Sequence, residues 1–118
     1  MIHKTGADLI EDAKTRIKQV TPADAIRDHD SSTVYLDVRE PNEWNLGHLP
    51  KAMHIPRGTL EGKVEEMIPR DRKVVVYCAS GNRSALAADT LQQMGYGSVA
   101  SLAGGFRGWA ESGGVVES

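Results

Sequence analysis

The chain has 118 residues but only one cysteine, Cys78, so it cannot form an internal disulfide and nothing requires an oxidising compartment. It has no basic excess, because 14 Lys and Arg stand against 16 Asp and Glu, and this argues against a general nucleic-acid or anionic-membrane binder. No apolar run approaches the length of a membrane span, and the start of the chain lacks the apolar stretch of a signal peptide. From these absences we expect a soluble, cytoplasmic protein that binds neither nucleic acid nor membrane.

The length suits one compact domain with a hydrophobic core, and the chain contains no internal repeat and no low-complexity linker. Segments rich in β-branched and apolar residues alternate with segments that carry helix-start signals. We expect strands at 33–38, 52–55, 73–78 and 98–102. We expect helices at 6–19, 41–47, 58–68, 84–94 and 106–112, and one more that Thr21 caps and Pro22 begins. This alternation predicts a three-layer α/β domain with a mostly parallel sheet.

Cys78 ends the most apolar of these strands, where "VVVY" gives way to the polar loop "ASGNR". In a parallel α/β sheet, ligands bind beyond the carboxyl ends of the strands and in front of helix N-termini. Gly81 and Asn82 can take left-handed backbone angles, which would turn successive N–H groups inwards as an anion-binding nest. The helix that begins near Ser84 points its N-terminus at the same place. We therefore expect Cys78 to react as a thiolate, with Arg83 as the fixed positive charge of the loop.

A structural interpretation of the same residues stands beside this one. A lone cysteine at a strand end is most often a small buried hydrophobe, and glycine, serine and asparagine are ordinary turn residues. The combination favours a nucleophilic or anion-handling role, because a tight turn has no use for an arginine and a buried thiol has no use for a helix N-terminus.

The chain closely resembles a single-domain rhodanese over residues 19–112. The resemblance rests on the order and spacing of five segments: LDVREPNEW (36–44), GHLPKAMHIP (47–56), VVVYCASGNRS (74–84), GY (95–96) and LAGGFRGW (102–109). It implies a three-layer rhodanese-like domain with a mostly parallel five-stranded sheet flanked by helices. It also implies a helical extension at 1–18, the rhodanese domain at 19–112 and a tail at 113–118.

The resemblance further implies a sulfurtransferase. Cys78 would take a sulfane sulfur from thiosulfate or a persulfide donor, become a persulfide and pass the sulfur to cyanide or a thiol acceptor, without metal or organic cofactor. Donor and acceptor would be small molecules, or proteins that donate a persulfide or accept sulfur on a thiol. The substrate would be bound by the loop residues Ala79, Ser80, Gly81, Asn82, Arg83 and Ser84.

Other segments of the resemblance have supporting roles. Asp37 and Arg39 follow a strand and are expected to pair with each other or with neighbouring loops, supporting the rim of the site. Gly104 and Gly105 are expected to permit a tight approach to the last helix. Glu43 departs from the two-domain thiosulfate enzymes of the family, which have a basic residue near this position that helps to hold the substrate.

Three other functions are compatible with the same fold. Related phosphatases and arsenate reductases use a loop one residue longer than the four residues that separate Cys78 from Arg83, and the shorter loop favours sulfur transfer. A non-enzymatic interaction module would usually have lost the cysteine. A persulfide carrier would differ in its sulfur donor but not in its chemistry.

Overall fold

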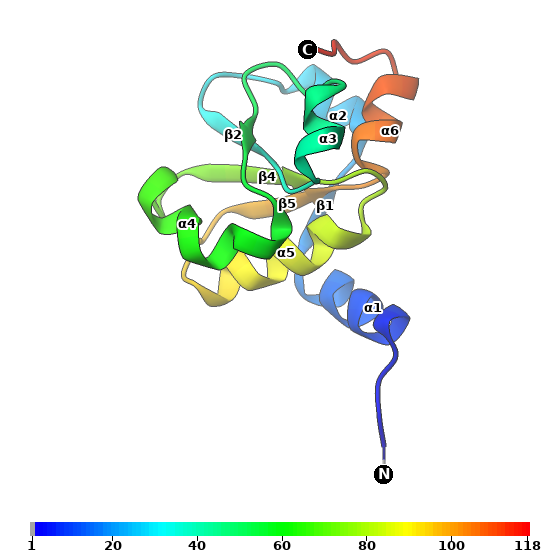
Figure 1. The fold of residues 1–118 in the computed structure, drawn as a ribbon, viewed down its shortest axis with the longest axis vertical. Coiled ribbons are helices and arrows are strands. Elements are labelled where there is room, and N and C mark those ends of the chain that lie inside the picture. The colour runs from blue at the N-terminus through cyan, green and yellow to red at the C-terminus, as the bar shows by residue number, and fades with distance from the viewer. Residues whose placement is uncertain (1) are drawn as a thin grey trace.

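Five parallel strands form one sheet in the computed structural model of the chain, which describes residues 2–118 (Figure 1). They are β1 (Lys18–Val20), β2 (Thr33–Asp37), β3 (Met53–His54), β4 (Lys73–Tyr77) and β5 (Val99–Leu102). Their order across the sheet is β1-β5-β4-β2-β3, and every neighbouring pair is parallel. The expected five-stranded α/β fold is confirmed, and β4, which leads into Cys78, is its central strand.

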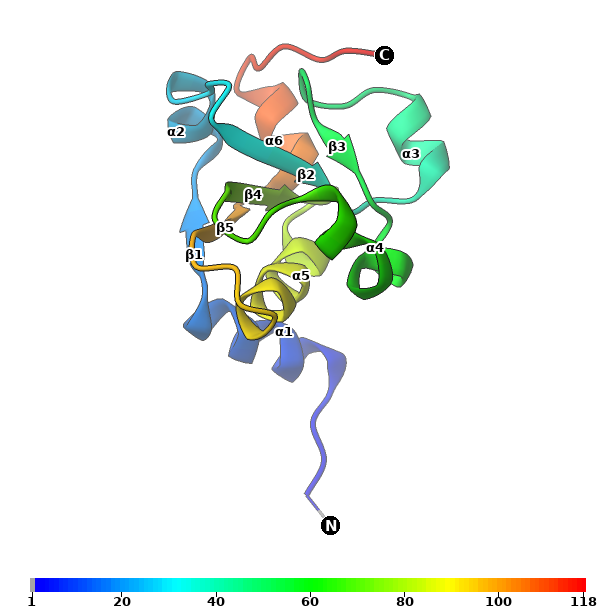
Figure 2. The same ribbon diagram turned by 90° about the vertical axis from the view of Figure 1, so that its left-hand side faces the viewer.

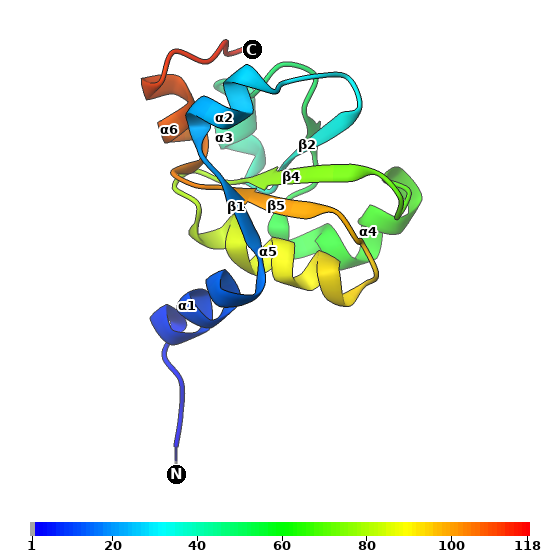
Figure 3. The ribbon, with the colours of Figure 1, turned by 180° about the vertical axis from the view of Figure 1, so that it is seen from behind.

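Helices cover both faces of this sheet (Figures 2 and 3). They are α1 (Gly6–Arg16), α2 (Pro22–Arg27), α3 (Pro41–Asn45), α4 (Leu60–Met67), α5 (Asn82–Gln93) and α6 (Gly105–Glu111), with a short 3-10 turn, η1 (Arg57–Thr59), before α4. α2 and α6 pack on one face, α4 and α5 pack on the other, and α1 lies outside α5. Within residues 2–118, none of these helices combines the length and the apolarity needed to cross a membrane.

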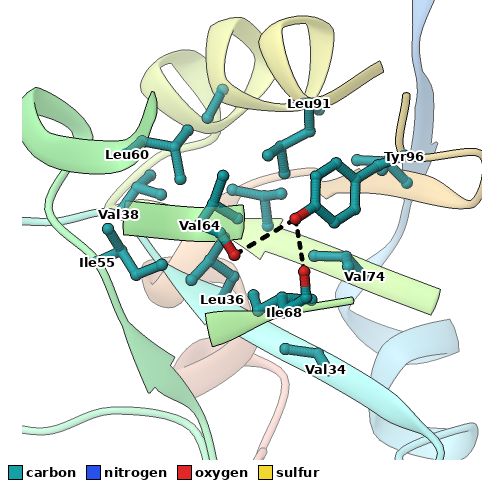
Figure 4. Close-up of a cluster of buried hydrophobic side chains, with 14 of the residues drawn as sticks. Val34, Leu36, Val38, Ile55, Leu60, Val64, Ile68, Val74, Leu91 and Tyr96 are labelled. Carbon is teal, nitrogen blue, oxygen red and sulfur yellow. Dashed lines mark hydrogen bonds between the residues drawn. The ribbon is translucent and has the colours of Figure 1, made fainter. Parts of the chain in front are cut away.

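The alternation of side chains along β4 assigns its residues to two buried clusters. Val74, Val76 and Cys78 join the cluster under α4 and α5, whereas Val75 and Tyr77 join the cluster under α2 and α6. Figure 4 shows the first cluster, in which the hydroxyl of a buried tyrosine, Tyr96, donates to backbone carbonyls at the end of α4. Each large side chain buried in this way contributes about 1.5–3 kcal/mol. The side chain of Cys78 therefore belongs to a packed core, at the point where β4 ends.

The helix predicted over 6–19 is too long. The structure ends it at Arg16 and gives Ile17 extended angles (φ −115°, ψ 163°). The next three residues pair with β5 as the edge strand β1, Lys18 opposite Ala100 and Val20 opposite Leu102. Three residues are too short to carry a strand pattern of their own, so backbone pairing across the fold decides their structure. The other predicted strands are confirmed to within two residues at either end.

Candidate functional site

The sulfur of Cys78 lies in a cradle of backbone N–H groups. The thiol follows β4, and the residue is 1% exposed. Its Sγ accepts hydrogen bonds from the N–H of Gly81 at 3.2 Å and from the N–H of Ser84 at 3.3 Å. Gly81 is the N-cap of α5 and Ser84 lies in its first turn, so the N-terminus of this helix faces the sulfur. Oriented N–H groups at a helix N-terminus stabilise negative charge, so the cradle is suited to charge that develops at the sulfur.

One glycine makes the curl of this loop. Gly81 has φ +103°, and a Cβ there would lie 3.2 Å from the backbone nitrogen of Gly104, so a larger residue would be both strained and crowded. The left-handed conformation predicted for Asn82 is wrong, because Asn82 is the first helical residue of α5. The left-handed conformation of Gly81 alone is enough to turn the N–H groups of Gly81 and Ser84 towards the sulfur. In the rest of the loop, Ala79 is half-buried and Ser80 is exposed at the tip.

A pair of buried serines continues from the sulfur into the sheet. The Oγ of Ser84 lies 3.5 Å from Sγ and 2.8 Å from the Oγ of Ser101, and both serines are 0% exposed. When Ser101 donates to Ser84, the Ser84 hydroxyl is free to donate to Sγ. Ser84 was among the residues predicted for the site, whereas Ser101 was not. The sequence feature that could have indicated Ser101 is a hydroxyl in the middle of an otherwise apolar strand.

The N-terminus of α6 holds the other side of the loop. The N–H of Phe106 donates to the carbonyl of Cys78 at 2.7 Å, and the N–H of Arg107 donates to the carbonyl of Ala79 at 3.1 Å. The approach is so close that a Cβ on Gly105 would lie 2.4 Å from the Cys78 carbonyl oxygen. Gly104 and Gly105 have φ of +75° and +58°, which confirms the expected tight approach to the last helix.

Asp37 and Arg39 form a buried ion pair beside the cradle, with side chains 0% and 5% exposed. The Arg39 guanidinium donates to both carboxylate oxygens at 2.7–3.0 Å and to the Gly47 carbonyl at 2.7 Å, and it lies 4.3 Å from the centre of the Phe106 ring. Burial lowers the pKa of Arg39, but the hydrogen bond with Asp37 and the attraction of nearby negative charges, Asp37 first, together outweigh it, and the net pKa is raised. Burial, together with the charge of Asp37, raises the pKa of Tyr77. The pair thus joins the end of β2 to the chain after α3, without touching Sγ.

Arg83, expected as the fixed positive charge of the loop, forms an ion pair. Its guanidinium nitrogens lie 3.4–3.5 Å from the carboxylate of Glu43 on α3. The Asp37 carboxylate is engaged by Arg39 instead. The side chains of Arg83 and Glu43 are 40% and 31% exposed, and partly exposed pairs of this kind contribute about 0–1 kcal/mol to stability. The main effect of Glu43 is therefore to offset the positive charge of Arg83 at the rim of the cradle.

The residues that the structure brings together thus define one site around the thiol. Of the residues predicted for the site, Gly81 and Ser84 contact the sulfur directly. Asp37, Arg39 and Arg83 lie around it as two ion pairs with different degrees of burial. No group of three His, Cys, Asp or Glu side chains that could hold a metal ion occurs in the part of the chain that the structure describes, residues 2–118.

Comparison with known proteins places this geometry in a family context. The model of the rhodanese-like domain matches residues 21–112. A sulfurtransferase of Allochromatium vinosum is 44% identical over 78 residues, which cover 66% of this chain and 72% of that protein. The candidate sulfur carrier protein YrkF of Bacillus subtilis is 38% identical over 82 residues, 70% of this chain, and the match spans 44% of its length.

Solved structures with the same fold include two with different descriptions. A Rhodopseudomonas palustris protein of unknown function, described as a possible tyrosine phosphatase, superposes with a TM-score of 0.90 at 38% identity over 99% of this chain and 97% of that one. The polysulfide-sulfur transferase homodimer of Wolinella succinogenes superposes with a TM-score of 0.79 at 28% identity, over 92% of this chain and 83% of that one.

Proposed function

The chain belongs to the family of rhodanese-like domains, and on this premise we propose that it transfers sulfane sulfur through a persulfide on Cys78. The donor is thiosulfate or a persulfide, and the acceptor is cyanide or a thiol. The observation that carries the proposal is the pair of N–H groups, from Gly81 and Ser84, that donate to Sγ. A buried thiol that served only for packing would have no need of two backbone donors.

The first half-reaction charges the cysteine. The thiolate of Cys78 attacks the outer sulfur of thiosulfate, the S–S bond of the donor breaks, and sulfite leaves with the electron pair. The product is an anionic persulfide on Cys78. The N–H groups of the first turn of α5, which hold the thiolate, then face the outer sulfur and stabilise its charge.

The second half-reaction restores the thiolate. The carbon of cyanide, or the sulfur of a thiol acceptor, attacks the outer sulfur of the persulfide. The S–S bond breaks and its electron pair returns to Sγ, while thiocyanate or a new persulfide leaves. The serine pair supports this step, since the hydroxyl of Ser84, with Ser101 behind it, can donate to the regenerated thiolate.

Intact-mass spectrometry tests the proposal directly. After incubation with thiosulfate, we expect the protein to gain the mass of one sulfur atom and to lose it on addition of cyanide. The Cys78→Ser variant should gain nothing, because an alcohol is a far weaker nucleophile at neutral pH and cannot form a persulfide. Circular dichroism of the variant controls for its fold. Thiosulfate:cyanide turnover by the serine variant near the wild-type rate would refute the proposal.

A phosphatase is the second candidate, because the structure that covers 99% of this chain is described as a possible tyrosine phosphatase. The length of the loop after Cys78 argues against phosphatase activity. Only four residues separate Cys78 from Arg83, and the N–H groups of this short curl already contact the sulfur itself rather than enclosing a larger oxyanion. We expect negligible hydrolysis of p-nitrophenyl phosphate. Hydrolysis at a rate comparable to that of sulfur transfer would reverse the assignment.

A further inference from the structure

Helix α1 lies outside the segment that matches the rhodanese-like domain, residues 21–112, yet it is fastened to α5, the helix that carries the cradle (Figures 1 and 3). Ala13 is 0% exposed. Arg16 donates to both carboxylate oxygens of Asp89 at 2.9 and 3.1 Å, and the side chain of Gln92 donates to the Arg16 carbonyl. The hydrogen bond from Arg16 lowers the pKa of Asp89. These contacts fix α1 against α5 on the side away from the sheet.

The same helix brings a lysine to the start of the cradle. Lys14 is one residue after Ala13, and its Nζ donates to the Oδ1 of Asn82 at 3.2 Å. Asn82 is the first residue of α5 and directly follows Gly81, whose N–H contacts the sulfur. The amide of Asn82 is neutral, so this contact fixes the position of Lys14 without cancelling its charge.

Among the basic residues of α1 and α5, Lys14 is the one that has no carboxylate partner in the described part of the chain. Arg83 faces Glu43, and Arg16 faces Asp89. Lys14 makes no ion pair within residues 2–118. An anion that approaches Cys78 therefore meets a positive potential to which Lys14 contributes and which Glu43 weakens at Arg83.

We propose that Lys14 of helix α1 is the electrostatic residue that draws anionic sulfur donors to Cys78. This inference rests on the proposed function, and it deepens it by assigning the donor class: a small anion, with a dianion favoured over a monoanion. Lys14 thereby adds a second positive charge to that of Arg83, which Glu43 offsets.

The first test does not depend on sulfur transfer. Iodoacetate, an anion, and iodoacetamide, which is neutral, both alkylate the same thiolate, so the ratio of their rates reports the potential at Cys78. In Lys14→Gln this ratio should fall about two- to fourfold at low ionic strength and match the wild type near 0.5 M salt. Lys14→Arg should keep the wild-type ratio. Lys73→Gln is the matched control, because Lys73 begins β4 at the opposite end of the strand from Cys78.

The second test uses two donors of different charge. Thiosulfate is a dianion and methanethiosulfonate is a monoanion, and each delivers its outer sulfur to the thiolate with sulfite or methanesulfinate as the leaving group. Because the electrostatic free energy scales with the charge of the donor, the fold loss of kcat/KM in Lys14→Gln for thiosulfate should be about the square of the loss for methanethiosulfonate.

The outcomes separate this inference from the proposed function. A wild type that forms no persulfide with either donor would refute the sulfurtransferase, while the alkylation ratio would still decide the role of Lys14. An equal ratio in Lys14→Gln and Lys73→Gln would overturn the inference. So would a ratio that falls in Arg107→Gln but not in Lys14→Gln, since Arg107 follows the α6 residue bonded to Cys78. A loss of activity in Lys14→Gln that ignores salt and accompanies a lower melting temperature would also overturn it.

Discussion

Replacing Gly105 by alanine tests whether α6 holds the cradle in place. Gly105 has φ +58°, and a Cβ there would lie 2.4 Å from the Cys78 carbonyl oxygen and 2.7 Å from the carbonyl carbon of Ala79. Its neighbour Gly104 offers a matched control, with φ +75° and only ordinary contact, 3.5 Å from the Cα of Gly108. The two substitutions share the left-handed backbone, and they differ in the collision with the loop.

The structure sets the size of the two effects. An alanine in the left-handed region costs about 1–2 kcal/mol, and this is the whole loss of unfolding free energy expected for Gly104→Ala. At Gly105 the backbone of the loop has to move by several tenths of an ångström, and overpacking of this kind adds about 1–3 kcal/mol. This movement displaces Cys78, the residue that carries Sγ. We therefore expect persulfide formation in Gly105→Ala to slow by about ten- to a hundredfold.

Urea unfolding and single-turnover mass spectrometry measure the two quantities separately. With a slope of about 2 kcal/mol per molar urea, the midpoint of Gly105→Ala should lie about 0.5–1.5 M below that of Gly104→Ala. The rate of sulfur uptake from thiosulfate is compared without urea, in samples with native circular dichroism. Equal midpoints and equal rates for the two variants would refute the reasoning, because the collision with Cys78 would then have no consequence.

Three further predictions concern the ion pairs and the buried hydroxyl. Asp37→Asn should lower the free energy of unfolding by about 3–5 kcal/mol in urea titrations, because it leaves the buried Arg39 without a counter-charge; a loss below about 1 kcal/mol would contradict a tightly buried pair. Glu43→Gln should raise kcat/KM for thiosulfate about two- to fivefold at low ionic strength by freeing Arg83, and the gain should vanish near 0.5 M salt. An unchanged low-salt value would show that Glu43 does not weaken donor binding. Ser101→Ala should slow persulfide formation about two- to tenfold, the equivalent of one neutral hydrogen bond, and wild-type kinetics would exclude the serine pair from the reaction.

The parts of the site that the sequence could predict are local. An apolar strand, a glycine and a helix start follow one another within a dozen residues, so the direction of the N–H groups towards Cys78 depends on backbone rules alone. The mutual pairing of Asp37 and Arg39 was one of two options kept open. Two residues apart at a strand end, they can meet across the turn, and burial of both selects that option.

The features that could not be predicted depend on contacts between segments that are distant in the sequence. Glu43 meets Arg83 across forty positions of the chain, and Lys14 meets Asn82 across sixty-eight. No periodicity in a single sequence reports such a pair. The strand β1 was missed for the same reason, because its three residues become a strand only through their partners in β5. Ser101 was missed for the same reason, because only the fold brings it to Ser84.

The order of the strands has a consequence for the nascent chain. β4 lies between β2, which is synthesised before it, and β5, which is synthesised after it. The N–H groups that hold the carbonyls of Cys78 and Ala79 belong to Phe106 and Arg107. Since a chain is synthesised from its N-terminus, Cys78 is made before these partners and emerges from the ribosome ahead of them. During that interval the thiol lacks its finished cradle, and it is then most open to oxidants and to chemical trapping.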